Sequence, residues 1–424
     1  MDLKETAREQ LCEFKGDAYS FGIDCLDGAG PQAAKFGKRA LIIANPSEWM
    51  KPTVDSVRAA LAAADVDTLA TTPGARPNSP LEDTYRMQDA IEKARPTVMA
   101  AIGGGSTIDA AKSANVLATL TPGAHDLEPF FGVDKVSEAL DGRKLTPMVA
   151  VETAASSGAH LTKYSNITNL ETGQKKLVND PAIVPPAAVF DYSVTTSASR
   201  DLTIDGAFDG ISHCLEVYCG AKGRILDKVE PIALAGIELC ISGVAPATAD
   251  ANDLEAREML GLGTDLGGYC IMTGSTNAGH LSSFSLVDVT THGRATAVLN
   301  PYYLVLFANA VESQLEQLAA LFRRTGHLKT DVSNLSGRDL SLAVAGAWKS
   351  LLESLGVPTA MSQFDDFTPA HIDRSVEAAK NPQLEMKLKA MPVPMDAAAV
   401  DKYMRGALEA AAEGDIEKAP TMPA

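Results

Sequence analysis

Between residues 39 and 112, short apolar runs alternate with helical patterns along the chain. The runs RALIIA, DTLATT and VMAAI are separated by SVRAALAAADV and TYRMQDAIEKA, whose apolar residues recur at helical spacing. Short apolar strands that alternate with helices are typical of a parallel sheet covered on both faces. The segments LTPMVAVET and AAVFDYS add strands, and the polar stretch KYSNITNLETGQKKLVNDP is predicted to form a hairpin.

After about residue 195 the pattern changes, and helical periodicity dominates in five long segments from GAFDGISHCLEVYCG to LAVAGAWKSLLESLG. The chain has 424 residues, which is more than one hydrophobic core usually supports. We therefore predict two domains. The fold class is an α/β, Rossmann-like N-terminal domain with a parallel sheet over residues 1–193, plus an all-α C-terminal domain over residues 194–424.

The charge balance and the apolar content exclude several classes of partner. The formal net charge of −17 argues against nucleic acid and anionic membranes, because both require a concentrated basic surface. The six cysteines are scattered without a CxxC pair, which is typical of reduced thiols. The N-terminus lacks the apolar stretch of a signal peptide, and no run approaches about 20 apolar residues. These features predict a cytoplasmic protein with no membrane partner.

Three consecutive glycines, Gly103, Gly104 and Gly105, follow the strand-like VMAAI and open a helical run. Glycines let the backbone approach a ligand closely, and the free N–H groups of a helix N-terminus attract phosphate. The segment therefore predicts a pyrophosphate-binding loop that includes Ser106 and Asp109. The alternative is an ordinary strand-to-helix turn capped by Ser106. The loop matches neither GxGxxG nor the Walker pattern.

Four residues in the second half could hold a divalent metal ion. Asp209 and His213 are spaced i, i+4, so that a helix presents a carboxylate and an imidazole on one face. His280 and His292 lie in a stretch rich in Gly, Ser and Thr. One carboxylate with three imidazoles is a competent set for iron(II) or zinc, with a position left for a substrate oxygen. The alternative is a helix hydrogen bond or an exposed polar pair.

Several segments resemble the iron-containing (group III) alcohol dehydrogenases, which are related in fold to glycerol dehydrogenase and dehydroquinate synthase. The resemblance covers nearly the whole chain and is carried by FGIDCLD, GGGSTIDAAK, DYSV, FDGISHCLEVY and THGRATAVLNP. It implies that Asp209, His213 and His292 bind the catalytic metal, with His280 as the middle histidine ligand. His280 and His292 are also the expected catalytic residues. The resemblance further implies a homo-oligomer.

The chain departs from the family pattern in two places. NAGHLSSFSLVDVTTHG is shorter than the family's HxxxHxLG segment, and serines replace its second histidine. The family's PTTAGTGSE is replaced by ETAASSGAH. Thr153, Ser156, Ser157 and Gly158 are then expected to replace the usual Thr and Gly groups around the cofactor. His160 stands where the family has Glu, and we expect it either in the substrate pocket or on a solvated loop.

Two further residues concern the nicotinamide cofactor. Relatives often place an aspartate after the first strand, where it binds the ribose 2′-OH and repels a 2′-phosphate. Asn45 stands there in this chain. The expected cofactor is NAD, with NADP as the alternative. Lys176 matches the family lysine near the nicotinamide ribose, and its alternative role is that of a surface lysine on a hairpin.

These residues predict a metal-dependent oxidoreductase that transfers a hydride between NAD(P)(H) and a small alcohol or aldehyde, in a cleft between the two halves. Iron(II) is the expected metal, with zinc as the alternative. Lys163 and Arg294 lie near site motifs and could receive an anionic substituent of the substrate, although a surface or structural role is favoured for each. Two other functions are considered: a non-redox lyase similar to dehydroquinate synthase, and a non-catalytic nucleotide-binding protein with a degraded metal site.

Overall fold

The computed structural model describes residues 2–423, and its main sheet has six strands in the order β1-β9-β6-β4-β2-β3. Every neighbouring pair in this sheet is parallel, as the alternating pattern predicts. The strands are β1 (Tyr19–Gly22), β2 (Arg39–Ala44), β3 (Asp67–Pro73), β4 (Val98–Gly103), β6 (Met148–Glu152) and β9 (Ala187–Asp191).

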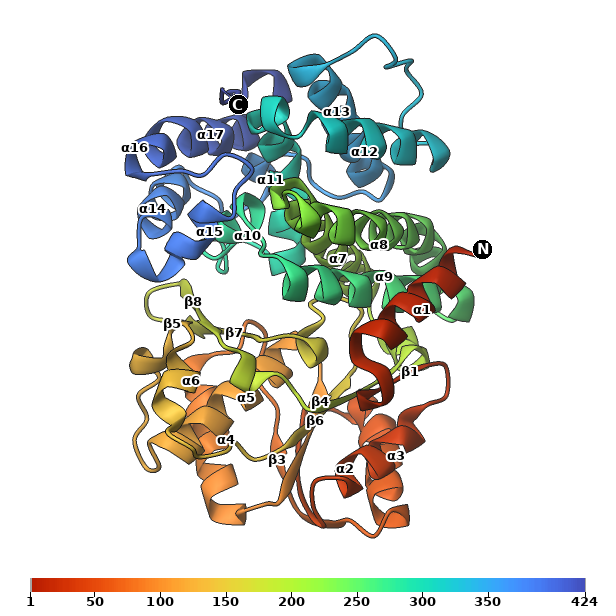
Figure 1. Cartoon of the computed structure of the whole chain (residues 1–424), viewed down its shortest axis with the longest axis vertical. Helices are drawn as coiled ribbons and strands as arrows, with labels where there is room; N and C mark the ends of the chain where they lie inside the picture. Colours follow the sequence, from red (N-terminus) through yellow and green to blue (C-terminus); the bar gives the residue numbers. More distant parts are fainter. Residues whose placement is uncertain (1, 424) are drawn as a thin grey trace. The chain divides into compact units, whose positions relative to one another are not determined.

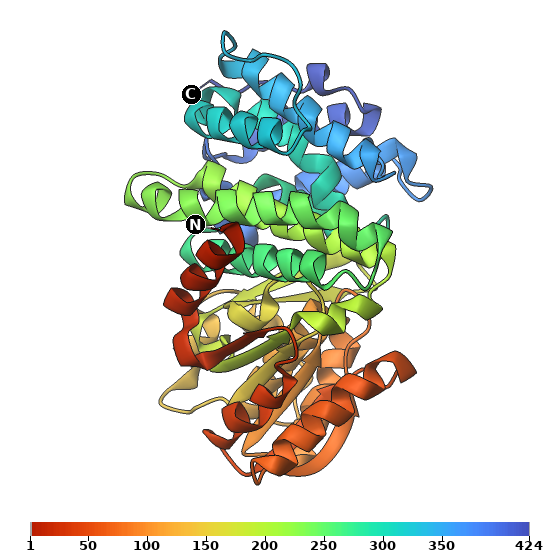
Figure 2. The same ribbon diagram turned by 90° about the vertical axis from the view of Figure 1, so that its right-hand side faces the viewer.

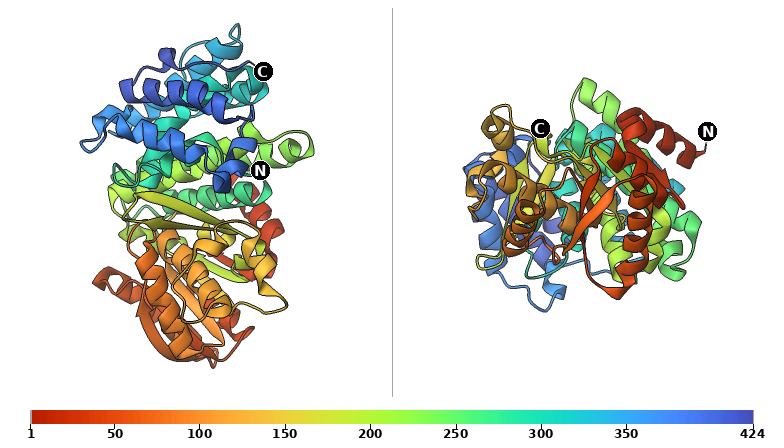
Figure 3. Two further views of the ribbon diagram at one scale, coloured as in Figure 1. Left: turned by 90° about the vertical axis from the view of Figure 1, so that its left-hand side faces the viewer. Right: turned by 90° about the horizontal axis from the view of Figure 1, so that it is seen from below.

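Helices cover both faces of this sheet, because its central strands are apolar on both sides (Figure 1). Leu41 and Ile43 of β2 pack in one core with α4 and α5, whereas Ala40 and Ile42 pack in a second core with α2 and α3. Figures 2 and 3 show the same layers from other directions. The helices of this region are α2 (Ala29–Ala34), α3 (Lys51–Ala63), α4 (Leu81–Ala94), α5 (Gly105–Leu120) and α6 (Lys135–Leu140).

The predicted hairpin is confirmed: β7 (Tyr164–Asn169) and β8 (Gln174–Asn179) pair antiparallel, and the short β5 (Gly132–Val133) joins them in a second sheet. The hairpin packs on α5 through hydroxyl groups. The Ser165 hydroxyl donates to the backbone oxygen of Asp109 at 2.7 Å and lies 2.7 Å from the Ser113 hydroxyl. This contact connects the hairpin to the helix that begins at the three glycines.

The C-terminal region is helical, and no strand occurs among the described residues after Asp191. All five predicted helical segments form helices. The long helices are α7 (Arg200–Gly220), α8 (Arg224–Ala249), α9 (Leu254–Thr273), α11 (His292–Leu306), α12 (Glu312–Arg324) and α13 (Gly337–Ser354). The shorter ones are α10 (Ala278–Ser283), α14 (Ala370–Ala379), α15 (Glu385–Lys389), α16 (Ala397–Ala399) and α17 (Arg405–Glu413). The chain begins with α1 (Leu3–Lys15).

The chain forms two compact units that are not continuous halves. One contains Arg8–Thr203 with Ala249–Gly261, and the other contains residues 2–7, Ile204–Thr248 and residues 262–423. These units group residues by their contacts and do not test whether independent domains meet after residue 193. That boundary stays a prediction. Within residues 2–423, only α8 is long and apolar enough to cross a membrane. Most of its apolar stretch is buried, as in a core helix.

Candidate functional site

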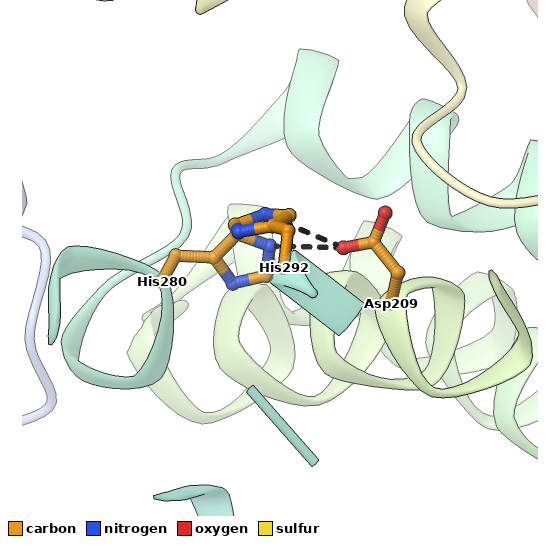
Figure 4. A group of neighbouring side chains, drawn as sticks. All are labelled: Asp209, His280 and His292. Atoms are coloured by element: carbon orange, nitrogen blue, oxygen red, sulfur yellow. Dashed lines mark ion pairs between the residues drawn. The ribbon is translucent and has the colours of Figure 1, made fainter. Parts of the chain in front are cut away.

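Three histidine rings surround one oxygen of Asp209. Asp209 and His213 lie one turn apart on α7, and both are buried. The Oδ1 atom of Asp209 is 3.7 Å from Nε2 of His213, 3.5 Å from Nε2 of His280 and 3.6 Å from Nε2 of His292. Figure 4 shows His280, from α10, and His292, the first residue of α11, directed at Asp209. The helical unit thus places all four predicted metal ligands around one carboxylate oxygen. Asp209, His280 and His292 form the group whose ligand atoms could share an ion, and His213 lies outside that group.

The donor atoms of this cluster fit a divalent metal ion. One ligand atom each from Asp209, His280 and His292 lies within 4.8 Å of the others. Two ligands bonded at about 2.1 Å to the same ion lie at most about 4.2 Å apart, so the three N–O separations suit a shared ion. Nε2 of His280 is buried and has no hydrogen-bond partner among the described residues. A metal would satisfy this nitrogen.

The electrostatics of the cluster favour the metal-binding forms of Asp209 and His213, whereas Glu216 and Asp209 raise the pKa of His280 against the effect of burial. Burial alone would raise the pKa of Asp209, but the imidazoles of His213, His292 and His280 hold it well below its usual range. Burial lowers the pKa of His213 to about 4. Asp209 is therefore ionised and His213 neutral at neutral pH. These are the forms that bind metals.

Asp205, one turn before Asp209 on α7, fixes the start of α11. Its carboxylate accepts hydrogen bonds from the Thr291 hydroxyl at 2.7 Å and from Nε of Arg294 at 2.8 Å. Gly293 packs so closely that an added Cβ would lie 1.9 Å from the backbone oxygen of Asp205. Arg294 therefore has a structural partner, the role favoured from the sequence, and its contact with α7 places His292.

Ser283, one of the serines within the shortened histidine segment, sets the orientation of the His292 ring. The Ser283 hydroxyl donates to the backbone oxygen of His280 at 2.7 Å and lies 3.0 Å from Nδ1 of His292. Because its one proton is used on the carbonyl, this hydroxyl accepts a hydrogen bond from Nδ1–H of His292. The other nitrogen, Nε2, then carries no proton and faces Asp209.

In the α/β unit, the three glycines connect β4 to α5. An added Cβ on Gly105 would lie 2.4 Å from the Ser157 hydroxyl, so this position requires glycine for the loops to approach. Gly104, rather than Ser106, is the N-cap of α5, so the expected capping residue is wrong. The choice between a pyrophosphate-binding loop and an ordinary turn stays a prediction. The Ser106 hydroxyl accepts a hydrogen bond from the backbone of Asn78 at 3.1 Å. Asp109 accepts one from the backbone of Asn166 at 2.9 Å.

Lys112, the last residue of GGGSTIDAAK, is a buried anchor that the sequence reasoning did not single out. Its ammonium group donates to the backbone oxygens of Ala159 at 2.7 Å, Thr162 at 3.0 Å and Tyr164 at 2.7 Å. These carbonyls follow the predicted cofactor segment, which runs from Thr153 through Ser156 to Gly158. Lys112 therefore connects α5, the helix that begins at the three glycines, to the predicted cofactor segment.

His160 is buried, so the expectation of a solvated loop histidine is wrong. Its Nδ1 is 3.1 Å from Oε2 of Glu152, and its Nε2 is 3.0 Å from the hydroxyl of Tyr19. The other oxygen of Glu152 accepts the backbone N–H groups of Thr153 and Ala154. This hydrogen-bonded chain fixes the start of the predicted cofactor segment.

The other predicted cofactor residues have defined partners. Asn45 follows β2, and its side-chain oxygen accepts hydrogen bonds from the backbone N–H and the hydroxyl of Ser47 at 3.0 and 2.6 Å. Lys176 lies on the partly exposed side of β8 and forms an ion pair with Glu128 at 2.7 Å. Lys175, which the sequence reasoning missed, is buried and donates to the side chain of Asn78 at 3.2 Å. Because successive side chains of a strand point to opposite faces, the sequence could have predicted that one of the two lysines is buried and the other exposed.

The fold and the two sites define a class of protein: an α/β unit with a glycine loop at the carboxyl end of its sheet, and a helical unit with a buried Asp–His cluster. Comparison with known families agrees. The family "Iron-containing alcohol dehydrogenase" matches residues 17–192, and "Fe-containing alcohol dehydrogenase family, C-terminal" matches residues 203–401. The chain belongs to the iron-containing alcohol dehydrogenase family.

Individual relatives align over most of the chain. A choline dehydrogenase of Bacillus subtilis (strain 168) is 25% identical and aligns with 85% of this chain and 87% of its own length. An NAD-dependent methanol dehydrogenase of Bacillus methanolicus is 25% identical over 82% and 87%. The crystal structure of a 1,3-propanediol oxidoreductase has the same fold, with a TM-score of 0.78, 22% identity and coverage of 93% and 97%.

The chain is therefore a metal-dependent oxidoreductase of the alcohol dehydrogenase type. It transfers a hydride between a nicotinamide cofactor and a small alcohol or aldehyde. The family match favours this activity over the lyase and over the non-catalytic protein considered from the sequence.

Proposed function

We propose that the chain uses NAD and iron(II), and that Asp209, His213, His280 and His292 hold the metal. The observation that carries this proposal is the arrangement of three imidazole nitrogens within 3.5 to 3.7 Å of one buried carboxylate oxygen. The names of relatives support NAD, and the family description supports iron. Zinc and NADP are the alternatives that the experiment below separates.

A bound divalent ion supplies Lewis-acid chemistry, which favours the alkoxide of an alcohol or polarises the carbonyl of an aldehyde. The chain's own residues prepare this chemistry. Asp209 contributes the negative charge, and His213 is kept neutral by burial. The His292 side chain is 25% exposed against 3% for Asp209, so we place the substrate on the side of His292.

The cofactor is held by the α/β unit in this proposal. Gly103, Gly104 and Gly105 leave the α5 N-terminus open to the pyrophosphate. Ser106 and Asp109 brace this loop, while Thr153, Ser156 and Gly158 face the nicotinamide half. Asn45 lies at the ribose of the adenosine, where it places no charge against a 2′-phosphate. Lys176, which pairs with Glu128 at 2.7 Å, is the lysine proposed near the nicotinamide ribose.

We further propose that the protein works in the cytoplasm, as the sequence features predict, and that it forms a homo-oligomer, as the family resemblance implies. Its partners are then its substrate, its cofactor and other copies of itself.

The test is oxidation of NADH and NADPH with short aldehydes by protein stripped with a chelator, before and after iron(II) without oxygen or zinc is added back. We expect metal to restore turnover, and His213→Ala to abolish it. His125→Ala is the matched control, because His125 pairs with Asp89 on the surface of the α/β unit. Absence of turnover with every pairing, together with no stoichiometric metal uptake, would overturn the proposal.

A further inference from the structure

We propose that Glu216 is a positioning residue, which sets the ring orientation and the tautomer of His280 for metal binding. This inference rests on the proposed function. Glu216 lies two turns after Asp209 on α7, so one helix supplies two ligands and the group that orients a third. The Glu216 side chain is buried, and its carboxylate is directed at α10 through hydrogen bonds to three different residues.

The contact between Glu216 and His280 defines the position of the ring proton. Oε1 of Glu216 is 2.7 Å from Nδ1 of His280. An ionised carboxylate only accepts hydrogen bonds, so Nδ1 of the ring is the donor. The neutral ring then carries its proton on Nδ1 and presents the lone pair of Nε2. That nitrogen lies 3.5 Å from Oδ1 of Asp209, on the side of the metal cluster.

The hydrogen-bond partners of the Glu216 carboxylate are donors, which keep it ionised and hold it in place. The backbone N–H of Asn277 donates to Oε2 at 2.7 Å, and the amide of Asn300 donates to Oε1 at 3.2 Å. The backbone N–H of His280 lies 3.2 Å from Oε1. The ammonium group of Lys387 adds a favourable charge interaction. A buried carboxylate that accepts this many hydrogen bonds is held in one position.

The backbone of α10 is shaped to accept this carboxylate. An added Cβ on Gly279 would lie 2.6 Å from Oε1 of Glu216 and 2.5 Å from the side-chain oxygen of Asn300. The glycine before His280 therefore allows the carboxylate to reach the ring. Carboxylates that orient a metal-binding imidazole typically change metal affinity by about 10- to 100-fold when they are lost.

The first experiment measures the metal affinity of Glu216→Gln, with zinc and with iron(II), against a competing chelator. The amide has one oxygen, so its NH₂ group must face either Asn277 or His280. When it faces His280, the ring proton moves to Nε2 and blocks the ligand atom. When it faces Asn277, Nδ1–H of His280 meets a neutral oxygen in place of the charged carboxylate, so the ring becomes a weaker metal ligand. We expect the dissociation constant for metal to rise by about 10- to 100-fold.

The control is Glu230→Gln on α8, which removes a carboxylate that accepts a hydrogen bond from the Tyr218 hydroxyl of α7 at 2.8 Å. This variant should bind metal as the wild type does. Equal metal affinity of wild type and Glu216→Gln would overturn the positioning role and leave the proposed function intact. Absence of metal binding by the wild type would instead overturn the proposed function.

A second measurement needs no substitution at Glu216, so it does not depend on whether the Glu216→Gln variant folds. Nitrogen NMR of the metal-free wild type, labelled at histidine, reports the tautomer of His280 at alkaline pH, where the ring is neutral. The His280 signals are assigned by their loss in His280→Asn. We expect protonated Nδ1 and unprotonated Nε2. Protonated Nε2 would overturn the inference.

Discussion

Gly293→Ala should displace His292 from the metal cluster, because the added methyl group has no room. It would lie 1.9 Å from the backbone oxygen of Asp205 and 2.7 Å from the carbonyl carbon. Ordinary contact begins at 3.4 Å, so the first turn of α11 would have to move by about 1.5 Å. Metal–ligand distances tolerate only about 0.2 Å. The movement would therefore take Nε2 of His292 out of bonding range.

The expected loss exceeds the roughly 10- to 100-fold in metal affinity that removal of an outer partner costs, because a ligand itself is lost. Metal titration of the stripped protein against a chelator measures this, with His292→Ala as the reference that should match. The control is Gly346→Ala on α13, where an added Cβ meets nothing within 4 Å. Wild-type metal affinity in Gly293→Ala would refute the packing argument.

Three further outcomes follow from single residues. Lys112→Met should lower the free energy of unfolding, measured in urea, by about 3 kcal/mol, because three buried carbonyls lose their donor. Lys176→Met, which removes a partly exposed ion pair, should change this free energy little, and equal effects of the two substitutions would contradict the anchor role of Lys112. Asn45→Asp should lower the ratio of kcat/KM for NADPH to that for NADH by about 10-fold, and an unchanged ratio would remove Asn45 from the ribose site. Burial is the main cause, and the charge of Asp191 a further one, that raises the pKa of the Cys25 thiol to about 12. This thiol stays protonated near pH 8, so its alkylation, measured by mass spectrometry, should accelerate only as the pH approaches 12. Cys12, which is exposed, should be alkylated first.

Two parts of the metal cluster differ in how far the sequence predicts them. The pair Asp209 and His213 follows from helical spacing alone, since i and i+4 share a face. The i, i+3 spacing, which also shares a helix face, would have found Glu216, three residues beyond His213. No local rule places His292 beside Asp209. That contact depends on the packing of Gly293 on Asp205, two residues that are far apart in the chain.

The alternation of strands and helices, the glycine loop after β4, the hairpin of β7 and β8 and the helical second half could all be predicted from the sequence. These features depend on periodicity and turn residues within short windows. The partners of the buried polar groups instead depend on tertiary packing. Tyr19 meets His160 across 141 residues, and Lys112 reaches the carbonyls of residues 159 to 164. A buried polar side chain must find a partner, and the packing of distant elements determines which partner lies within reach.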